Sequence, residues 1–102
     1  MQIKHRMVNG MLYISICGEL DEGTARFTVS RLDEIISNIT AKQIVFDLSE
    51  LSFMDSTGIG VLLGRYKKLK ALGIGVFIAN PSSHAERIFR LTGLYEIMPK
   101  IS

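Results

Sequence analysis

Two short, mainly apolar runs constrain the fold of this chain more than any other feature. They span residues 43–48 and 75–79 and are rich in β-branched side chains. Such runs are typical of strands that are covered on both faces in the middle of a sheet. Between them, residues 56–72 carry apolar side chains at helical spacing. A strand, a helix and a strand in this order predict parallel strands joined by a right-handed crossover.

The N-terminal part predicts a hairpin followed by a helix. Residues 12–17 alternate between large apolar and smaller side chains, as a strand with one buried face does. The Asn-Gly pair at 9–10 favours a tight turn back to an earlier strand near 3–8. Residues 24–39 then fit a helix with one apolar face, and Phe27 falls on its polar side. We expect Phe27 to be either a partner contact or covered by the loop before this helix, and prefer the loop.

The C-terminal part predicts further elements with recognisable ends. Gly73 ends the second helix as a left-handed cap, and Gly93 closes a third helix in the same way. That third helix opens where Ser83 and Glu86 have the spacing of a capping box. Residues 97–101 are expected to add a short final strand. The whole order predicts an α/β fold, with a mixed sheet of four to five strands and helices mainly on one face.

Length and composition limit what the chain can be. A length of 102 residues leaves room for one hydrophobic core, so residues 1–102 are expected to form a single domain. The net charge of +2, with basic residues spread along the chain, argues against nucleic acid as a partner. No apolar run approaches the roughly 20 residues that span a bilayer, so we expect no membrane association and a cytoplasmic location. The single cysteine, Cys17, is expected to be a buried free thiol.

A polar segment that contains glycines stands where the second helix begins. Asp55 or Ser56 can cap that helix, which contributes about 1 kcal/mol. Two details favour a functional role. First, the three consecutive side chains of residues 55–57 carry oxygen atoms, where one would suffice as a cap. Second, Gly58 and Gly60 each weaken a helix by up to about 1 kcal/mol relative to alanine. The residues alone leave both interpretations open.

A serine at a helix N-terminus is also a favourable place for a phosphate group. Free backbone N–H groups and the positive end of the helix dipole stabilise an anion there. Phosphorylation of Ser56 would keep the fold and add roughly −1.5 to −2 of charge beside Asp55. A partner surface built for a neutral hydroxyl would then be repelled, so this segment has the properties of an off switch.

The outer side of the second helix is the predicted partner surface. Gly60, Val61 and Gly64 fall away from the apolar stripe, and small residues let another backbone approach closely. The alternative is that Gly60 and Gly64 pack against a neighbouring element of the same chain. The stripe that is expected to face the core comprises Ile59, Leu62, Leu63, Tyr66 and Leu69.

Enzyme chemistry finds little support in the sequence. An aspartic protease needs two aspartates that share a proton, and the Asp-Ser-Thr-Gly segment at 55–58 is one residue longer than its usual motif. A serine hydrolase needs a histidine base, but only His5 and His84 exist and the Gly-x-Ser-x-Gly elbow is missing. His84 is expected at the surface. Since metal-ligand spacing and a phosphate-binding glycine loop are also missing, we expect no catalysis, no metal and no cofactor.

Four segments together resemble a known family. They are Gly-Glu-Leu-Asp at 18–21 with Thr24, the strand at 44–48, Phe-Met-Asp-Ser-Thr-Gly at 53–58, and Arg-Leu-Thr-Gly-Leu at 90–94. In this order and spacing the chain resembles the STAS domain family over nearly its whole length, and specifically the bacterial anti-sigma factor antagonists. The stretch from 51 to 70 is most similar to the sporulation branch, which controls sigma F, and the general-stress branch comes second.

The resemblance implies a single STAS domain that works by partner switching. The unphosphorylated form would bind an anti-sigma factor that is also a serine kinase, which releases the sigma factor. Ser56 matches the phosphorylated position, and phosphorylation would switch binding off until a serine phosphatase restores it. ATP and Mg²⁺ belong to the kinase, so this chain itself would need no cofactor. A monomer or weak dimer is expected.

The same resemblance indicates the residues that bind the kinase. Asp21 matches an acidic loop beside the phosphorylation site and is expected to contact the kinase. Asp55, Thr57 and Gly58 are expected to do so with it. For Asp21, a helix cap or a solvated loop charge is the alternative. Several relatives have a second serine at the position of Thr57, so Thr57 is a second candidate acceptor.

Two other kinds of protein use related domains. A module that accompanies a membrane transporter predicts transmembrane segments in the same chain. A scaffold subunit of a larger signalling complex usually predicts an additional N-terminal domain. We expect neither, because the 102 residues offer no such segment and no length for a second domain.

Overall fold

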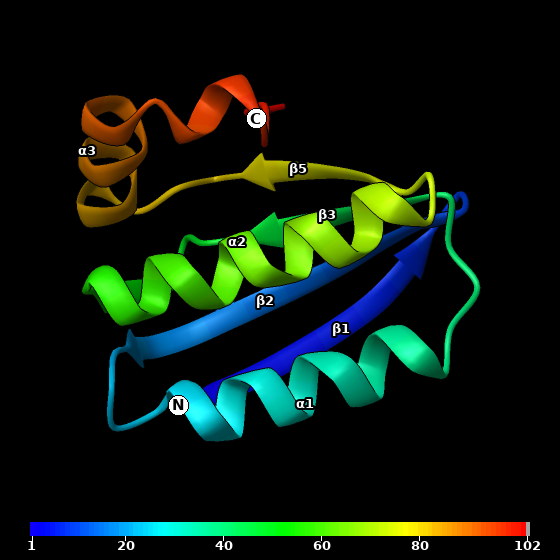
Figure 1. The fold of residues 1–102 in the computed structure, drawn as a ribbon, viewed down its shortest axis with the longest axis horizontal. Coiled ribbons are helices and arrows are strands. Elements are labelled where there is room, and N and C mark those ends of the chain that lie inside the picture. The colour runs from blue at the N-terminus through cyan, green and yellow to red at the C-terminus, as the bar shows by residue number, and fades with distance from the viewer. Residues whose placement is uncertain (102) are drawn as a thin grey trace.

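A five-stranded mixed sheet forms the frame of the molecule (Figure 1). The computed structural model describes residues 1–101. Along the chain the elements are β1 (Gln2–Val8), β2 (Met11–Leu20), α1 (Ala25–Ser37), β3 (Gln43–Asp47), β4 (Leu51–Met54), α2 (Ser56–Ala71), β5 (Gly75–Ala79), α3 (Ser83–Thr92) and the short 3₁₀ helix η1 (Leu94–Glu96). The predicted α/β fold with a mixed sheet is therefore confirmed.

The strand order is β1-β2-β3-β5, and β4 pairs with the far part of β2. β1 and β2 form an antiparallel hairpin, and its turn holds Asn9 and Gly10 at positive φ. This is the conformation for which an Asn-Gly pair is favoured. The remaining pairings are parallel, with Leu12 beside Ile44 and Ile44 beside Val76. The two apolar runs of the sequence are thus parallel strands connected through α2, as predicted, and they pair directly with each other.

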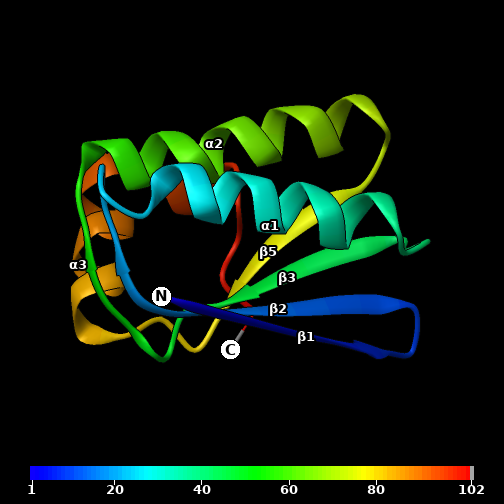
Figure 2. The same ribbon diagram turned by 90° about the horizontal axis from the view of Figure 1, so that it is seen from below.

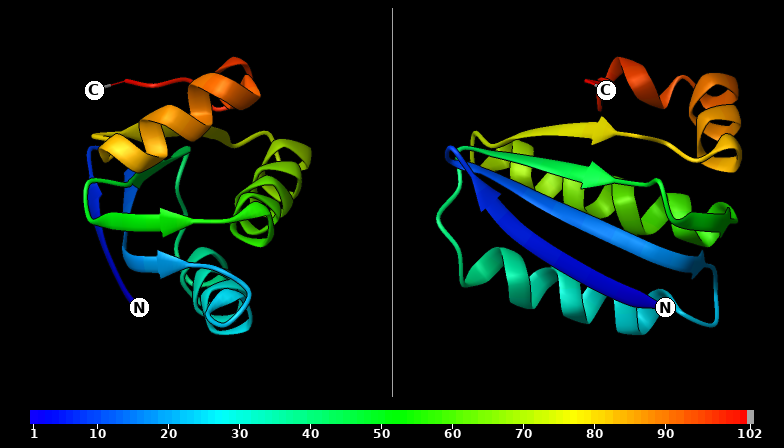
Figure 3. Two further views of the ribbon diagram at one scale, coloured as in Figure 1. Left: turned by 90° about the vertical axis from the view of Figure 1, so that its left-hand side faces the viewer. Right: turned by 180° about the vertical axis from the view of Figure 1, so that it is seen from behind.

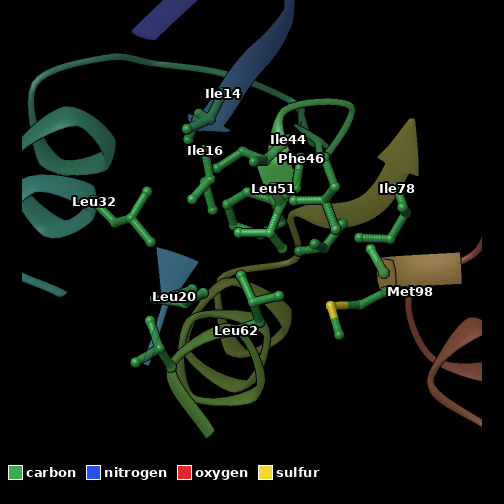
Figure 4. Packing of buried hydrophobic residues seen from close by; sticks show 14 of the residues in the cluster. Ile14, Ile16, Leu20, Leu32, Ile44, Phe46, Leu51, Leu62, Ile78 and Met98 are labelled. Carbon is green, nitrogen blue, oxygen red and sulfur yellow. The ribbon is translucent and has the colours of Figure 1, made fainter. Parts of the chain in front are cut away.

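α1 and α2 lie side by side on one face of the sheet (Figure 2 and Figure 3). Between these helices and the sheet, the buried side chains of Ile14, Leu32, Phe46 and Leu62 belong to one hydrophobic core (Figure 4). α3 lies at the end of the sheet where the parallel strands finish (Figure 1). None of the helices within residues 1–101 is both long and apolar enough to cross a membrane.

Several strand boundaries differ from the sequence prediction. β2 continues to Leu20 instead of ending at residue 17, and β4 occupies residues 51–54, to which no element was assigned. The pairing of β2 with β4 shifts register just after residue 18. Such an irregularity interrupts the alternation that would reveal a longer strand. The strand expected over 97–101 is reduced to one parallel bridge to β5.

The start of α3 is set by a different serine from the predicted one. Ser82 is the capping residue, and its hydroxyl accepts a hydrogen bond from the Ala85 N–H at 3.3 Å. The same hydroxyl donates to the carbonyl oxygen of Leu51 at 2.5 Å, which ties α3 to β4. The capping box predicted from Ser83 and Glu86 is therefore wrong by one residue, because a tertiary contact to β4 selects Ser82.

Two side chains are more exposed than expected. Cys17 is half-buried because it lies on the opposite side of β2 from Ile16, which points into the core. Its Sγ donates a hydrogen bond to Glu50 Oε2 at 3.2 Å. Partial burial and then this carboxylate raise the pKa of the Cys17 thiol. Phe27 is 52% exposed, so the preferred interpretation that the loop before α1 covers it is wrong.

Candidate functional site

The candidate site lies at the edge of the sheet where β2 and β4 end. These strands are parallel, with Leu20 opposite Met54, and each is followed directly by an aspartate, Asp21 or Asp55. The carboxyl ends of parallel strands meet at one edge. The structure therefore brings Asp21 beside the start of α2. All three α-helices begin on this side of the molecule (Figure 1).

Asp55 is the residue that caps α2. Its Oδ1 accepts a hydrogen bond from the Gly58 N–H at 2.9 Å, and its carbonyl oxygen accepts one from the Ile59 N–H at 3.0 Å. Ser56 is therefore the first helical residue and is not needed as a cap. Both Ser56 and Thr57 are exposed, and N–H groups at the first positions of a helix have no partner within it. The Ser56 hydroxyl is thus accessible at the positive end of α2.

Asp21 has a local structural role at the same edge. Its Oδ1 accepts a hydrogen bond from the Thr24 N–H at 3.1 Å, and its own N–H donates to Thr24 Oγ1 at 3.0 Å. Thr24 Oγ1 in turn donates to the Glu19 carbonyl oxygen at 2.7 Å. These reciprocal bonds resemble a capping box and hold the loop between β2 and α1. Asp21 thus holds the loop and is not itself the residue that caps α1, which is Thr24. The backbone just before Asp21 reaches the start of α2, because the Leu20 carbonyl oxygen accepts a hydrogen bond from the Asp55 N–H at 3.3 Å.

Gly58 serves the packing of the protein itself. It is buried, and a Cβ at this position would collide with the Leu20 carbonyl oxygen and lie 2.8 Å from Met54 Cγ. Only a residue without a side chain lets α2 start against the ends of β2 and β4. The prediction that Gly58 contacts a partner is therefore wrong, because neighbouring strands already cover it.

The buried stripe of α2 is rotated from the predicted one. Val61 was expected on the outer partner surface, but it is 7% exposed and belongs to the core, so that prediction is wrong. The reason is that Gly58 and Arg65 are also buried, and a prediction based on apolar spacing does not count a glycine or an arginine as buried. The buried residues are Gly58, Val61, Leu62, Arg65 and Leu69.

Gly60 and Gly64 lie on the outer side of α2, as predicted. A Cβ at either position would meet nothing within 4 Å, so packing against another element of the chain does not explain these glycines. Gly60 is exposed and Gly64 is half-buried. The two glycines are about one helical turn apart, so this part of the α2 surface is a shallow strip without side chains.

Sequence reasoning assigned no role to two further residues near the site. Phe53 is 40% exposed on β4, and its ring centroid lies 5.2 Å from that of His84 at the start of α3. His84 is half-buried rather than at the surface, and its Nε2 lies 3.3 Å from the Met54 carbonyl oxygen. Recognising β4 would have found Phe53, because Leu51 and Met54 are buried while the residues between them face out.

The comparisons with known proteins agree with this architecture. A family model described as the STAS domain matches residues 2–102. An anti-sigma F factor antagonist of Paenibacillus polymyxa is 35% identical over 99 residues, which cover 97% of this chain and 85% of that protein. An anti-sigma-B factor antagonist of Staphylococcus aureus is 32% identical over 88 residues, which cover 83% of this chain and 78% of that protein.

Solved structures give the same result. The anti-sigma factor antagonist SpoIIAA in its unphosphorylated form is 29% identical and superposes with a TM-score of 0.75, covering 99% of this chain and 89% of that one. The Bacillus cell fate determinant SpoIIAA in the phosphorylated form is also 29% identical, with a TM-score of 0.69 and coverage of 99% and 92%. Both forms of that protein therefore share the fold described above.

Proposed function

The chain belongs to the STAS domain family, and on that basis we propose that it is an anti-sigma factor antagonist. The observation that supports this most is the 35% identity to an anti-sigma F factor antagonist over 97% of the chain. In this role the unphosphorylated protein binds an anti-sigma factor, which then releases its sigma factor in the cytoplasm. The activity is binding rather than catalysis, and the chain needs no cofactor.

Phosphorylation of Ser56 is the proposed off switch. The hydroxyl is exposed at the first position of α2, while Asp55 supplies the cap independently. A phosphate there is stabilised by the helix N-terminus, yet it adds roughly −1.5 to −2 of charge beside Asp55. A partner that accepts a neutral hydroxyl at this edge is then repelled. SpoIIAA, which has been solved in both forms, is a precedent for the modification.

The proposed partner surface follows the exposed side of the α2 start. It comprises Asp21, Asp55, Thr57, Gly60 and Gly64, and the last two let a partner backbone approach closely. The partner is an anti-sigma factor that is also a serine kinase and brings its own ATP and Mg²⁺. A serine phosphatase returns the protein to the binding form.

The sporulation branch is the favoured setting, with general stress as the alternative. The P. polymyxa relative is named for sigma F and the S. aureus relative for sigma B, at 35% and 32% identity. Binding measurements against one anti-sigma kinase of each branch separate the two settings. Tighter binding to the sigma F type supports sporulation, and tighter binding to the sigma B type overturns that assignment.

The switch is tested by incubating the protein with the kinase and ATP and following phosphate incorporation by mass spectrometry. We expect one phosphate on the wild type and on Ser52→Ala, a control that removes the hydroxyl of another exposed serine, on β4 just before the site. We expect none on Ser56→Ala. Kinase binding should be kept by Ser56→Ala and lost by Ser56→Asp.

Each failure has a separate meaning. Phosphate that persists on Ser56→Ala and disappears on Thr57→Ala would make Thr57 the acceptor. Equal kinase binding by Ser56→Asp and the wild type would show that charge at this position does not control the complex. If the wild type neither binds nor is modified by kinases of either branch, the proposed function is wrong.

A further inference from the structure

A groove lies at the opposite end of α2 from Ser56. It has a volume of about 810 Å³ and is formed by the C-terminal halves of α1 and α2 with the segments that follow them. This is within the range of roughly 300–1,000 Å³ that is usual for sites of small ligands. Part of its wall is aliphatic and the rest is polar or charged; the aliphatic residues are Ile36, Ile39, Ala41, Leu69, Leu72 and Ile74.

Arg65 also lines this groove, and its charge is incompletely satisfied. The side chain is only 10% exposed, and its Nε lies 3.3 Å from Asp33 Oδ1 on α1. Within residues 1–101, neither Nε nor Nη1 of this buried guanidinium has a partner in hydrogen-bonding geometry. Buried charged donors normally have such partners, because leaving them unpaired is costly. The arginine therefore has donor capacity that the chain itself does not use.

The charges around the groove leave one positive charge unmatched. Asp33 is shared by two cations, since Lys68 Nζ lies 3.8 Å from its second oxygen. Glu34, the other carboxylate of the groove, is paired with Arg31. Two groove cations, Arg65 and Lys68, thus face one available carboxylate. A ligand with a single negative charge would complete this arrangement.

We propose that the groove binds a small monocarboxylate with an apolar body. The carboxylate accepts hydrogen bonds from Arg65, with Lys68 beside it, and the apolar body covers the aliphatic wall formed by the ends of α1 and α2. An arginine is suited to this task because its planar guanidinium matches a carboxylate. The site is separate from Ser56 and requires neither the anti-sigma factor nor phosphorylation.

Octanoate is the probe, and octan-1-ol is its uncharged counterpart with the same chain length. Each is titrated into the ¹⁵N-labelled protein below its micelle or solubility limit, and amide shifts are followed. We expect octanoate to shift amides of residues 33–41 and 65–74, and octan-1-ol to bind roughly tenfold more weakly or worse, because it cannot form the charged pair.

Two substitutions on exposed leucines provide a matched pair. Leu72 borders the groove and is 72% exposed, whereas Leu91 lies on α3 and is 77% exposed. Leu72→Glu adds a like charge at the groove and should weaken octanoate binding by roughly tenfold or more, while Leu91→Glu should leave it unchanged. Arg65→Met should abolish the preference for octanoate over octan-1-ol.

Three results would overturn the proposal. The first is the absence of shifts with octanoate. The second is equal binding of octan-1-ol, which would show an apolar groove without a carboxylate site. The third is equal loss of binding in the Leu72 and Leu91 variants, which would place the ligand elsewhere. Arg65 is buried, so the Leu72 and Leu91 pair keeps the test valid if Arg65→Met does not fold.

Discussion

Gly58 and Gly60 stand two residues apart in α2 and have opposite environments. A Cβ on Gly58 would meet the Leu20 carbonyl oxygen, whereas a Cβ on Gly60 would meet nothing within 4 Å. We expect Gly58→Ala to lower the free energy of unfolding by about 1–3 kcal/mol, as overpacking does. Gly60→Ala should raise it by up to about 1 kcal/mol, because alanine is the better helix former. Urea unfolding of the two variants measures both effects.

The pair provides its own control, since the same methyl group is added in the same helix. Equal stability changes of the same sign would contradict the packing described for Gly58. Gly60→Ala also bears on the partner surface. If a stabilised Gly60→Ala variant binds the anti-sigma kinase as tightly as the wild type, a close backbone approach at Gly60 is excluded.

At the residue scale, the sequence predicted the start of α2 more accurately than its buried side. Ser56 is the first helical residue, as predicted, and Asp55 is the cap, a choice that the sequence had left open between Asp55 and Ser56. The buried side of α2 was predicted wrongly because it includes Gly58 and Arg65. Neither residue is apolar enough to be counted in a helical hydrophobic pattern. Val61 was then assigned to the wrong side. Only the positions of the neighbouring elements reveal such a rotation.

At the scale of elements, α3 depends on a contact that lies far away in the sequence. Ser82 caps the helix and also bonds to the Leu51 carbonyl oxygen, while Ser83 is exposed at the first helical position. We expect Ser82→Ala to lower the free energy of unfolding by about 1–2 kcal/mol, and Ser83→Ala to change it little. Denaturant unfolding of both variants checks this. Equal losses, or a larger loss in Ser83→Ala, would support the capping box that the sequence suggested.

Whether a strand could be predicted depended on how clearly its residues show an apolar run or alternation. β5 was predicted with its observed bounds, because a buried parallel strand is a continuous apolar run. β4 was missed because it is short and pairs only with the end of β2, with a register shift inside that pairing. Its four residues show neither a continuous apolar run nor alternation. The candidate site lies at the end of that missed pairing. The sequence named Asp21, Asp55 and Ser56 as candidates, and their role stays a prediction. It recognised only in part the two strands that end at this site.

At the scale of the whole molecule, α2 links two regions of different character. Its N-terminus carries Ser56 directly after the capping Asp55, and its C-terminal half borders the groove of Arg65. Sixteen helical residues separate these ends by about 24 Å. The radius of gyration of 12.2 Å is close to the roughly 13 Å expected for one compact unit of this length. Ser56 therefore lies on a helix that is packed along much of its length rather than on a separate arm.

This arrangement predicts that phosphorylation changes the surface and leaves the fold intact. Ser56 is exposed, and the positive end of α2 favours the added charge, so the free energy of unfolding should stay equal or rise by up to about 1 kcal/mol. Thermal unfolding and amide spectra of the phosphorylated protein, compared with the same sample without ATP, measure this. Shifts should be confined to the site edge around Asp21 and the α2 start. Widespread shifts in β1 or loss of the cooperative transition would instead mean that the switch works by unfolding the domain.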